Sequence, residues 1–348
     1  MAIDVQQPLT PSSSQAQLFH IPDTLTRWPW PARTSPHIDK VKADFEALIK
    51  GYPQIERKAL KVLEYAQTDL IVCCVYPDLN EAQLGVVTAF SMVAWLVEEA
   101  VDAVDGIEAL TEIIMDALRH PFDARPAGEH IMGKMSRQWW FRVIKEMNPI
   151  SVQRLFHRME DWLLSCVHQS KISRSSRKET IEEYIETRKV NSGMPLCMTF
   201  LEMEVDIPQY VWEYPIFEEM KSLLSDIISL DNDMFSYNRE QSQGDYHNIL
   251  HIVMRDKQLG LQDALEWAER RHRSLQGEYF QVLAKMPSWG LEIDTQVEKY
   301  IGALGRMISG NVRYSALSKR YVDMRESKGP PDNRVFELLP PPAKTITE

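Results

Sequence analysis

The chain has 348 residues, enough to bury a large core either as two ordinary domains or as one large helical domain. It carries 39 Lys and Arg residues against 50 Asp and Glu residues, which gives a net charge of −11. This charge argues against electrostatic binding of nucleic acid or of anionic lipid. Any anionic ligand must therefore be held by local basic groups or by metal ions.

The cysteines and the longest apolar run bear on the compartment of the protein. The four cysteines have neither the spacing of zinc ligands nor that of a disulfide framework, which predicts a reducing, cytoplasmic compartment; they are Cys73, Cys74, Cys166 and Cys197. The longest nearly apolar run, residues 84–97, is shorter than the roughly 20 residues that a membrane-spanning helix needs. This run predicts a buried helix, and we expect no stable membrane insertion.

The N-terminal part of the chain precedes the predicted helices. Residues 1–17 are rich in Ser, Pro and Gln and lack a basic segment followed by an apolar one, so we interpret them as a disordered leader rather than a signal peptide. Residues 28–31 (Trp-Pro-Trp-Pro) place large rings on a backbone that proline stiffens. They predict a segment that packs over other elements instead of continuing a helix.

The rest of the chain has the pattern of a helical protein. From about residue 36 to about residue 325, amphipathic stretches alternate with breaks that contain Pro or Gly, and sustained period-two alternation is missing. We therefore predict a single all-α domain over residues 18–327. A Pro-rich tail, residues 328–348, follows and is predicted to be extended or loose.

The first candidate site lies at the end of the buried apolar run. Glu98 and Asp102 are four residues apart and Asp105 follows three residues later, so on a helix these carboxylates share one face, with Glu99 beside them. The run before them is apolar on all sides, which predicts a place in the centre of the fold, and Gly106 is the expected helix end. Acids at the carboxyl end of a helix oppose its dipole and repel one another, a cost that bound cations would remove. An acidic, solvated helix end is the alternative.

The second candidate site is a broken helix. Thr180 and Glu183 form a capping-box pattern at the start of a helix that carries Arg188, and residues 191–195 (Asn-Ser-Gly-Met-Pro) interrupt this helix. The backbone groups that a break frees must be satisfied, and such breaks tend to line a cavity. We expect Arg188 at the wall of a cavity; an ordinary surface ion pair is the alternative.

The third candidate site consists of three oxygen-bearing side chains at every fourth residue, Asn232, Ser236 and Glu240. On a helix they stand on one face within a span of roughly 12 Å. An amide oxygen, a hydroxyl and a carboxylate suit a small hard cation that keeps positions for water or phosphate, which describes Mg²⁺ better than zinc. Residues 224–228 place apolar side chains on nearly the same face, as at the mouth of an apolar cavity. A solvated polar helix face is the alternative.

The fourth candidate site lies close to the end of the last long helix. The cations Arg313, Lys319 and Arg320 lie near Tyr314 and Tyr321, which could donate hydrogen bonds to an anionic ligand. A basic helix end that complements the helix dipole is the alternative.

Taken together, these residues resemble class I terpene synthases, and in particular the fungal sesquiterpene synthases. Residues 232–240 match the second metal motif of that family, N-D-x-x-S-x-x-x-E, completely. Arg188, 44 residues before Asn232, stands where the family keeps its diphosphate-sensing arginine. Asn191 and Ser192 look like the positions that link this sensor to the helix break.

Two further matches and one departure complete the resemblance. Arg239 is similar to a basic position that contacts diphosphate, and Arg320 with Tyr321 matches the C-terminal R-Y pair of the family. The first metal motif of the family is D-D/E-x-x-D, whereas residues 98–102 read Glu-Glu-Ala-Val-Asp. Glutamate places its oxygens roughly 1.5 Å further out than aspartate, so Glu98 is expected to bind metal in an altered geometry or through water.

The resemblance implies a bundle of α-helices around a deep apolar pocket, in which Mg²⁺, as three ions with bound diphosphate, bridges the two motifs. The implied metal ligands are Glu98, Glu99, Asp102, Asn232, Ser236 and Glu240; the implied catalytic residues are Arg188, Arg239, Arg320 and Tyr321; and the implied substrate-binding residues are Trp95, Asn191, Ser192, Phe200 and Tyr314. For the aromatic members of this set, ordinary core packing is the alternative to stabilisation of a cation.

The reaction implied by the resemblance is Mg²⁺-dependent ionisation of farnesyl diphosphate to an allylic carbocation, followed by cyclisation and by deprotonation or water capture to a sesquiterpene. One alternative is an acyclic terpene alcohol synthase, which makes nerolidol from farnesyl diphosphate or linalool from geranyl diphosphate. A second alternative is a non-catalytic helical scaffold, whose only support is glutamate in place of aspartate at residue 98. We expect an isoprenoid diphosphate as the partner, no nucleic acid, and a monomer or homodimer.

Overall fold

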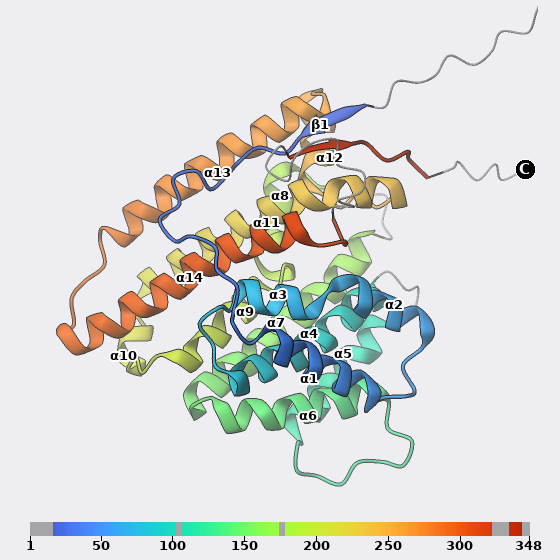
Figure 1. The fold of residues 1–348 in the computed structure, drawn as a ribbon, viewed down its shortest axis with the longest axis vertical. Coiled ribbons are helices and arrows are strands. Elements are labelled where there is room, and N and C mark those ends of the chain that lie inside the picture. The colour runs from blue at the N-terminus through green and yellow to red at the C-terminus, as the bar shows by residue number, and fades with distance from the viewer. Residues whose placement is uncertain (1–16, 102–105, 174–177, 322–333, 343–348) are drawn as a thin grey trace, which may run out of the picture.

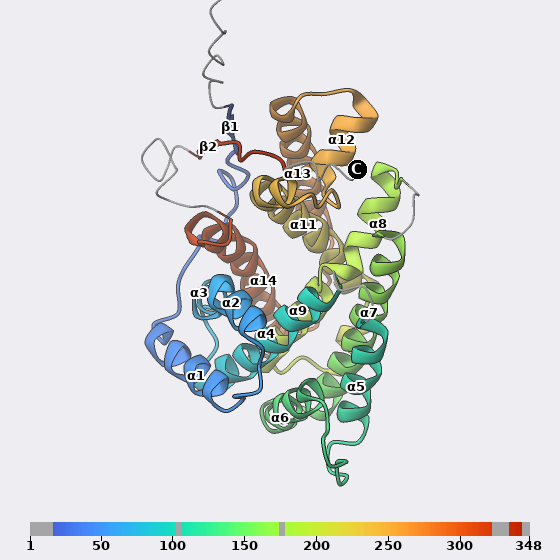
Figure 2. The same ribbon diagram turned by 90° about the vertical axis from the view of Figure 1, so that its right-hand side faces the viewer.

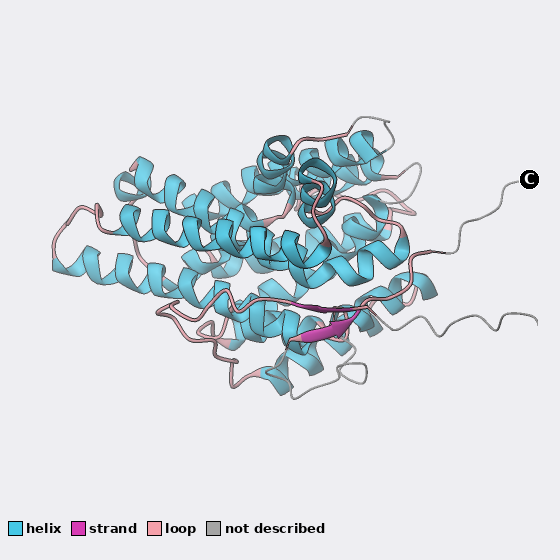
Figure 3. Ribbon diagram, turned by 90° about the horizontal axis from the view of Figure 1, so that it is seen from above, coloured by secondary structure: helices cyan, strands magenta, loops and turns pink. Residues whose placement is uncertain are grey.

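The computed structural model describes residues 17–101, 106–173, 178–321 and 334–342, and these ranges are helical apart from loops and one pair of short strands (Figure 3). The predicted all-α fold class is confirmed. The elements in chain order are β1 (Leu18–His20), α1 (Ile38–Lys50), α2 (Arg57–Ala66), α3 (Thr68–Val75), α4 (Glu81–Val101), α5 (Ile107–Arg119), α6 (Ile131–Glu146), α7 (Pro149–Ser173), α8 (Ile181–Asn191), α9 (Met194–Thr199), the 3₁₀ helix η1 (Phe200–Glu204), α10 (Gln209–Trp212), α11 (Pro215–Gln243), α12 (Ile249–Lys257), α13 (Leu261–Leu283), α14 (Leu291–Leu317) and β2 (Val335–Glu337).

Helix α4, which carries Trp95 and Glu98, lies deep in the bundle. Its neighbours are α1, α2 and α3 on one side and α5, α6 and α7 on the other, as Figure 2 shows. Because protein surrounds it, its sequence is apolar on all sides, and its buried Thr88 hydroxyl is satisfied by donating to the Leu84 carbonyl (2.7 Å). Within the described ranges, no helix combines the length and the apolar character that crossing a membrane requires.

Helix α11 carries Asn232, Ser236 and Glu240. It starts with Pro215, whose fixed φ suits the first helical turn, and it ends at Gly244, which adopts the left-handed conformation (φ +81°) that closes a helix. It packs against α8, α9, α12, α13 and α14, and Figure 1 shows α11, α13 and α14 side by side. Its buried Asp231 accepts a hydrogen bond from Thr24 (2.9 Å) and contacts His272 of α13 (3.2 Å). These contacts anchor the N-terminal segment and α13 to α11.

The Trp-Pro-Trp-Pro segment packs over α13 and α14, as predicted. Trp28 stacks on Tyr279 with ring centroids 5.6 Å apart, and its indole N–H donates to the Gly305 carbonyl (2.8 Å). Trp30 lies so close to Gly305 that a Cβ at that position would be 2.2 Å from the indole ring. Glycine at residue 305 is therefore required by this close approach.

Part of the Pro-rich tail belongs to the packed structure. Strand β2 pairs antiparallel with β1. At the end of the strand, Asn238 of α11 donates to the Glu337 carbonyl (2.9 Å) and accepts from the Leu339 backbone N–H (2.8 Å), and Gln241 donates to the Leu339 carbonyl (2.8 Å). The tail is therefore held against α11 at residues 337–339. The domain boundary at residue 328 stays a prediction because residues 322–333 lie outside the described ranges.

One helix end differs from the predicted one. The helical pattern was expected to reach about residue 325, but α14 ends at Leu317, where the Ser318 hydroxyl accepts the backbone N–H of Arg320 (3.0 Å) and holds a turn. Gly106 directly precedes the first residue of α5, and its predicted role as the end of the helix that carries Glu98 stays a prediction because residues 102–105 lie outside the described ranges. Helix α4 is described as far as Val101.

Candidate functional site

The carboxyl end of α4 meets the turn that follows α14. Trp95 and Glu98 are three residues apart and share a helix face. Arg320 lies over the Trp95 ring, with its guanidinium carbon 4.4 Å from the ring centroid, and its Nη2 is 3.6 Å from Glu98 Oε2. Burial opposes the charge on this guanidinium, but the neighbouring Tyr321 and Glu98 raise the pKa of Arg320 overall. The predicted Asp102, and Asp105 beyond it, lie outside the described residues.

Glu99 has a different neighbour from Glu98. It forms an ion pair with Lys58 of α2, because consecutive residues of a helix point about 100° apart. Of the two glutamates, Glu98 is therefore the one that the structure brings to Arg320. A metal-binding role for Glu99 stays a prediction.

The break between α8 and α9 has the predicted form. Thr180 and Glu183 form a reciprocal capping box, in which the Glu183 N–H donates to Thr180 Oγ1 (3.2 Å) and the Thr180 N–H donates to Glu183 Oε2 (3.0 Å). After α8 ends, Gly193 adopts a left-handed conformation (φ +70°) against the indole of Trp162. The Trp162 N–H donates to the Asn191 carbonyl (3.2 Å), which satisfies one backbone group that the break frees.

The two residues that link Arg188 to the break hold the local backbone. Asn191 donates from its side chain to Gln169 of α7 (2.9 Å), and the Ser192 hydroxyl accepts the backbone N–H of Met194 (3.3 Å). Contact of Asn191 or Ser192 with substrate stays a prediction.

Arg188 joins α8 to α11. Its Nη2 donates to Asn232 Oδ1 (2.9 Å) and to Asp233 Oδ1 (3.0 Å), and its Nη1 is 3.5 Å from Asn191 Oδ1. Burial opposes the charge on the guanidinium, but neighbouring acidic groups, including Asp233 and Glu240, raise the pKa of Arg188. The arginine is therefore a fixed positive charge beside the predicted metal motif.

Asn232, Ser236 and Glu240 lie on successive turns of α11, on the face that the sequence predicts. Ser236 is 1% exposed, and the carboxylate of Glu240 accepts a hydrogen bond from Asn248 Nδ2 (3.0 Å). Burial and, to a smaller extent, the charge of Asp233 raise the pKa of Glu240. A carboxylate that is costly to ionise in this place is one that a bound cation would stabilise.

Arg239 directly precedes Glu240 on α11. Its charge partly counters the rise in the pKa of Glu240, and its Nε is buried without a hydrogen-bond partner among the residues that the structure describes. This donor suits an anionic ligand, and contact with diphosphate stays a prediction.

Helices α4 and α11 are connected through the turn that follows α14. The side chain of Asn232 donates to Tyr321 Oη (3.1 Å), and Tyr321 adjoins Arg320, which contacts Trp95 and Glu98 on α4. A continuous set of contacts therefore runs from α4 through the turn after α14 to α11, and from there to Arg188 on α8. Residues that lie far apart in the sequence are thus connected, and a shared metal site for the two motifs stays a prediction.

Two predicted pocket residues show the contacts of ordinary packing. The Tyr314 hydroxyl donates to the Ala66 carbonyl (2.6 Å), and Phe200 is fully buried against Phe90 (5.1 Å between centroids) and Trp139 (6.4 Å). A role of Tyr314 or Phe200 in substrate binding stays a prediction.

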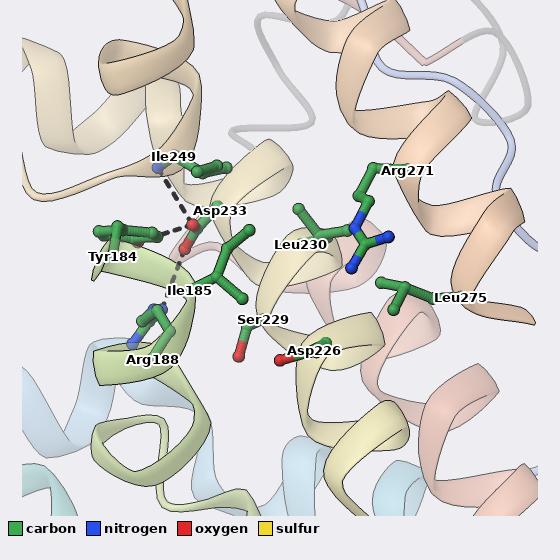
Figure 4. Close-up of a pocket in the computed structure, with 10 residues that line it drawn as sticks. All are labelled: Tyr184, Ile185, Arg188, Asp226, Ser229, Leu230, Asp233, Ile249, Arg271 and Leu275. Carbon is green, nitrogen blue, oxygen red and sulfur yellow. Dashed lines mark hydrogen bonds and ion pairs between the residues drawn. The ribbon is translucent and has the colours of Figure 1, made fainter. Parts of the chain in front are cut away.

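A small pocket beside Arg188 lies between α8, α11, α12 and α13. Figure 4 shows its lining, which consists of Tyr184, Ile185, Arg188, Asp226, Ser229, Leu230, Asp233, Ile249, Arg271 and Leu275. Asp226 Oδ1 and Ser229 Oγ are buried here and have no hydrogen-bond partner in the described part of the chain. Burial raises the pKa of Asp226 to about 6.

The donor set on α11 fits Mg²⁺. Among the described residues, no three His, Cys, Asp or Glu side chains gather closely enough to hold a metal ion. The oxygens of Asn232, Ser236 and Glu240 are hard ligands in the small number that Mg²⁺ takes when it keeps water or phosphate.

Two residues of the site were not singled out from the sequence. Asp233 is buried and accepts hydrogen bonds from the Tyr184 hydroxyl (2.7 Å) and from Arg188, and Asn248 contacts Glu240. Asp233 is part of the matched motif, so its position was visible but its partner was not. Asn248 precedes an apolar helical stretch and so could have been predicted as a helix cap, but no local pattern places it beside Glu240.

Comparison with protein families gives one matching model. Residues 90–276 match the family described as terpene synthase family 2, C-terminal metal binding. The matched range includes the end of α4, the break after α8 and the metal motif of α11.

Comparison with known sequences finds fungal relatives that align over most of the chain. Delta(6)-protoilludene synthase 18 of Postia placenta (strain ATCC 44394 / Madison 698-R) is 32% identical over 310 residues, which are 88% of this chain and 89% of that protein. Sesquiterpene synthase 9 of the same fungus is 32% identical over 327 residues, 93% of this chain and 95% of that protein.

Comparison with solved structures supports the same fold. The crystal structure of α-eudesmol synthase superposes with a TM-score of 0.73 at 18% identity and covers 83% of this chain and 98% of that chain. The linalool/nerolidol synthase from Streptomyces clavuligerus, in complex with 2-fluorogeranyl diphosphate, superposes with a TM-score of 0.73 at 16% identity and covers 84% and 99%. At this level of identity, both structures bear on the fold alone.

Proposed function

The chain belongs to the terpene synthase family and is a terpene synthase, and from this premise we propose that it is a Mg²⁺-dependent sesquiterpene synthase that acts on farnesyl diphosphate. The proposed reaction ionises the substrate to an allylic carbocation, which cyclises and is then quenched by deprotonation or by water. The names of the fungal relatives support the fifteen-carbon product class.

One observation carries the proposal. Arg188, Asn232, Tyr321, Arg320 and Glu98 form a connected set of contacts that joins the metal motif of α11 to the end of α4. It sets two guanidinium groups beside the carboxylate and amide oxygens that suit Mg²⁺. Such a site accounts for how a chain of net charge −11 holds a highly anionic substrate.

The basic residues act on the leaving group. Diphosphate leaves only when its growing charge is neutralised, and the guanidinium groups of Arg188 and Arg320 are placed for this task, with Arg239 beside Glu240 as a third donor. Tyr321, held by Asn232, adds a hydroxyl to the same region. These groups bind and orient the diphosphate so that it departs on one side of the carbon chain.

Asn232, Ser236 and Glu240 would hold Mg²⁺ on α11, and Glu98 with Asp102 is the proposed second set of ligands. When bound, Mg²⁺ supplies Lewis-acid neutralisation of the diphosphate oxygens. We propose three ions with bound diphosphate. The partly buried position of Glu240 limits contact of its carboxylate with water, which favours binding of a cation.

The pocket must protect the carbocation from bulk water. Trp95, one turn before Glu98, offers an aromatic face that would stabilise a cation by up to about 2 kcal/mol when water is excluded. Arg320 contacts this face, so the position of Arg320 decides how much of the ring a substrate meets.

A reducing, cytoplasmic compartment is part of the proposal. All four cysteines lie within the described ranges and are free thiols. We propose a monomer or homodimer that takes an isoprenoid diphosphate as its partner.

The test is incubation of the purified protein with farnesyl diphosphate, with and without Mg²⁺, followed by measurement of pyrophosphate and by gas chromatography with mass spectrometry of the extract. The expected result is Mg²⁺-dependent pyrophosphate release and a cyclic fifteen-carbon product. Geranyl diphosphate in a parallel incubation tests the chain-length preference.

The other outcomes are separable. Nerolidol, or linalool from geranyl diphosphate, would identify an acyclic alcohol synthase in which water quenches the first cation. No metal-dependent pyrophosphate release from either substrate would favour the helical scaffold without chemistry.

A further inference from the structure

Asn248 touches the metal motif from a different helix. It is the N-cap of α12, it is 1% exposed, and its side-chain amide nitrogen donates to Glu240 Oε2 (3.0 Å) and to the Asp233 carbonyl (2.8 Å). The same nitrogen is 3.5 Å from Ser236 Oγ. One side chain thus reaches two of the three predicted metal ligands of α11.

The orientation of this amide is fixed. Its Oδ1 accepts the backbone N–H of Leu250 (2.9 Å), which is the usual capping hydrogen bond of asparagine. Because the oxygen is committed to α12, the amide nitrogen must face α11. The donor that meets Glu240 is therefore held in place by the start of a helix.

We propose that Asn248 is a positioning residue for metal binding: it holds Glu240 by one carboxylate oxygen, Oε2, and leaves Oε1 to face the metal. This inference rests on the proposed function. A glutamate side chain has three rotatable bonds, and without a fixed donor Glu240 would lose its alignment with Asn232 and Ser236.

Ile249, the residue after Asn248, has a similar positioning contact that leads to Arg188. The backbone N–H of Ile249 donates to Asp233 Oδ2 (3.2 Å), while Asp233 Oδ1 accepts from Arg188 (3.0 Å). Asn248 and Ile249, at the start of α12, therefore hold two acidic side chains in position. These are Glu240, the proposed metal ligand, and Asp233, the partner of Arg188.

The test uses Asn248→Ser, because serine caps a helix about as well as asparagine but lacks the amide donor that reaches Glu240. Asn248→Gly, which removes every donor of the side chain and is also tolerated at a cap, is the second variant. The matched control is Asn148→Ser, since Asn148 caps α7 by accepting the backbone N–H groups of Ile150 (3.1 Å) and Ser151 (2.9 Å) far from the site.

The first readout is calorimetric binding of inorganic pyrophosphate in the presence of Mg²⁺, and the second is the midpoint of thermal unfolding without Mg²⁺. We expect Asn248→Ser and Asn248→Gly to weaken Mg²⁺-dependent pyrophosphate binding at least tenfold, while Asn148→Ser binds like the wild type. The Mg²⁺ concentration for half-maximal turnover should rise in the same two variants.

The outcomes separate the possibilities. Wild-type binding by both Asn248 variants would overturn the inference and leave the proposed function intact. Unfolding of both variants, or a fall in thermal midpoint with unchanged binding, would assign Asn248 a structural role only and would also overturn it. Absence of Mg²⁺-dependent pyrophosphate binding in the wild type would contradict the proposed function itself.

Discussion

Arg320 covers the face of Trp95, with its guanidinium carbon 4.4 Å from the ring centroid and its Nη2 3.6 Å from Glu98 Oε2. An aromatic face that accepts a guanidinium has the electrostatic character that would attract a carbocation. Glu98 supplies the opposite charge in the same contact. Glu98 stands where the family motif has aspartate. It also contacts Arg320, which is a proposed diphosphate-binding residue.

Glu98 is expected to tolerate aspartate better than an uncharged group. Glu98→Asp keeps the carboxylate but withdraws it by roughly 1.5 Å, so turnover should stay within about threefold of the wild type. Glu98→Gln removes the charge that faces Arg320 and the proposed metal, and turnover should fall about tenfold or more. Steady-state kinetics at several Mg²⁺ concentrations measure both effects.

The loss of turnover in Glu99→Gln provides the comparison for the two Glu98 variants. Because Glu99 is paired with Lys58 on α2, Glu99→Gln should cost less turnover than Glu98→Gln. A larger loss in Glu99→Gln than in Glu98→Gln would reverse the assignment of the two glutamates.

Glu240→Gln should separate activity from stability. Turnover of farnesyl diphosphate should fall at least about a hundredfold, because a charged ligand is lost from the proposed Mg²⁺ site. Burial raises the pKa of Glu240, so the folded protein binds its proton more tightly than the unfolded chain, and ionisation of this group lowers the free energy of unfolding as the pH rises. Without Mg²⁺ at pH 7.5, Glu240→Gln should therefore be at least as stable as the wild type.

The measurements for Glu240→Gln are pyrophosphate release and urea denaturation. Wild-type turnover would remove the role given to Glu240. A clear loss of stability without Mg²⁺ would instead show that its ionised carboxylate has stabilising partners.

Asp226 should make stability depend on pH. Its pKa is raised by burial to about 6 from an ordinary value of 3.8, so the folded protein binds its proton more tightly and the free energy of unfolding falls as the pH rises through this window. Asp226→Asn should raise the free energy of unfolding at pH 7.5 by roughly 1 to 3 kcal/mol. The gain should shrink when the pH is lowered to 5.

Urea denaturation of the metal-free protein at the two pH values checks this prediction. Asp206→Asn, which alters an exposed aspartate, is the control and should show no such gain. An equal gain for Asp226→Asn at both pH values would argue against titration of Asp226 in this range.

Gly310 fixes the distance between α14 and α3. A Cβ at this position would lie 2.0 Å from the Cys74 carbonyl oxygen, which is backbone and cannot move aside alone. Gly310→Ala should therefore destabilise the protein by about 3 kcal/mol. Gly277→Ala, in α13 where a Cβ meets nothing within 4 Å, should stabilise by up to about 1 kcal/mol. Thermal unfolding of the two variants measures the contrast, and equal midpoints would contradict the close approach.

The parts of the site that local patterns specify were predictable from the sequence. The capping box at Thr180, the break near Gly193 and the shared face of Asn232, Ser236 and Glu240 each depend on spacing within a few turns, and the structure has all of them. The buried character of α4 followed from its apolar composition on every side.

Contacts between distant segments could not be predicted in the same way. Glu98 meets Arg320, and Asn248 turns back to Glu240 after a loop, through packing that no periodicity encodes. The strand pair of β1 and β2 has three residues in each strand, too few for an alternating pattern to stand out. The end of α14 at Leu317 depends on one hydroxyl that satisfies the turn, which competes with the helical propensity of the following residues.

The most direct test of the central claim is a crystal structure with Mn²⁺ and inorganic pyrophosphate, in which anomalous scattering locates the ions. We predict an ion about 2.1 Å from oxygens of Asn232, Ser236 and Glu240, and pyrophosphate in contact with Arg188 and Arg320. Anomalous peaks that lie away from this face of α11, with pyrophosphate bound elsewhere, would contradict the account.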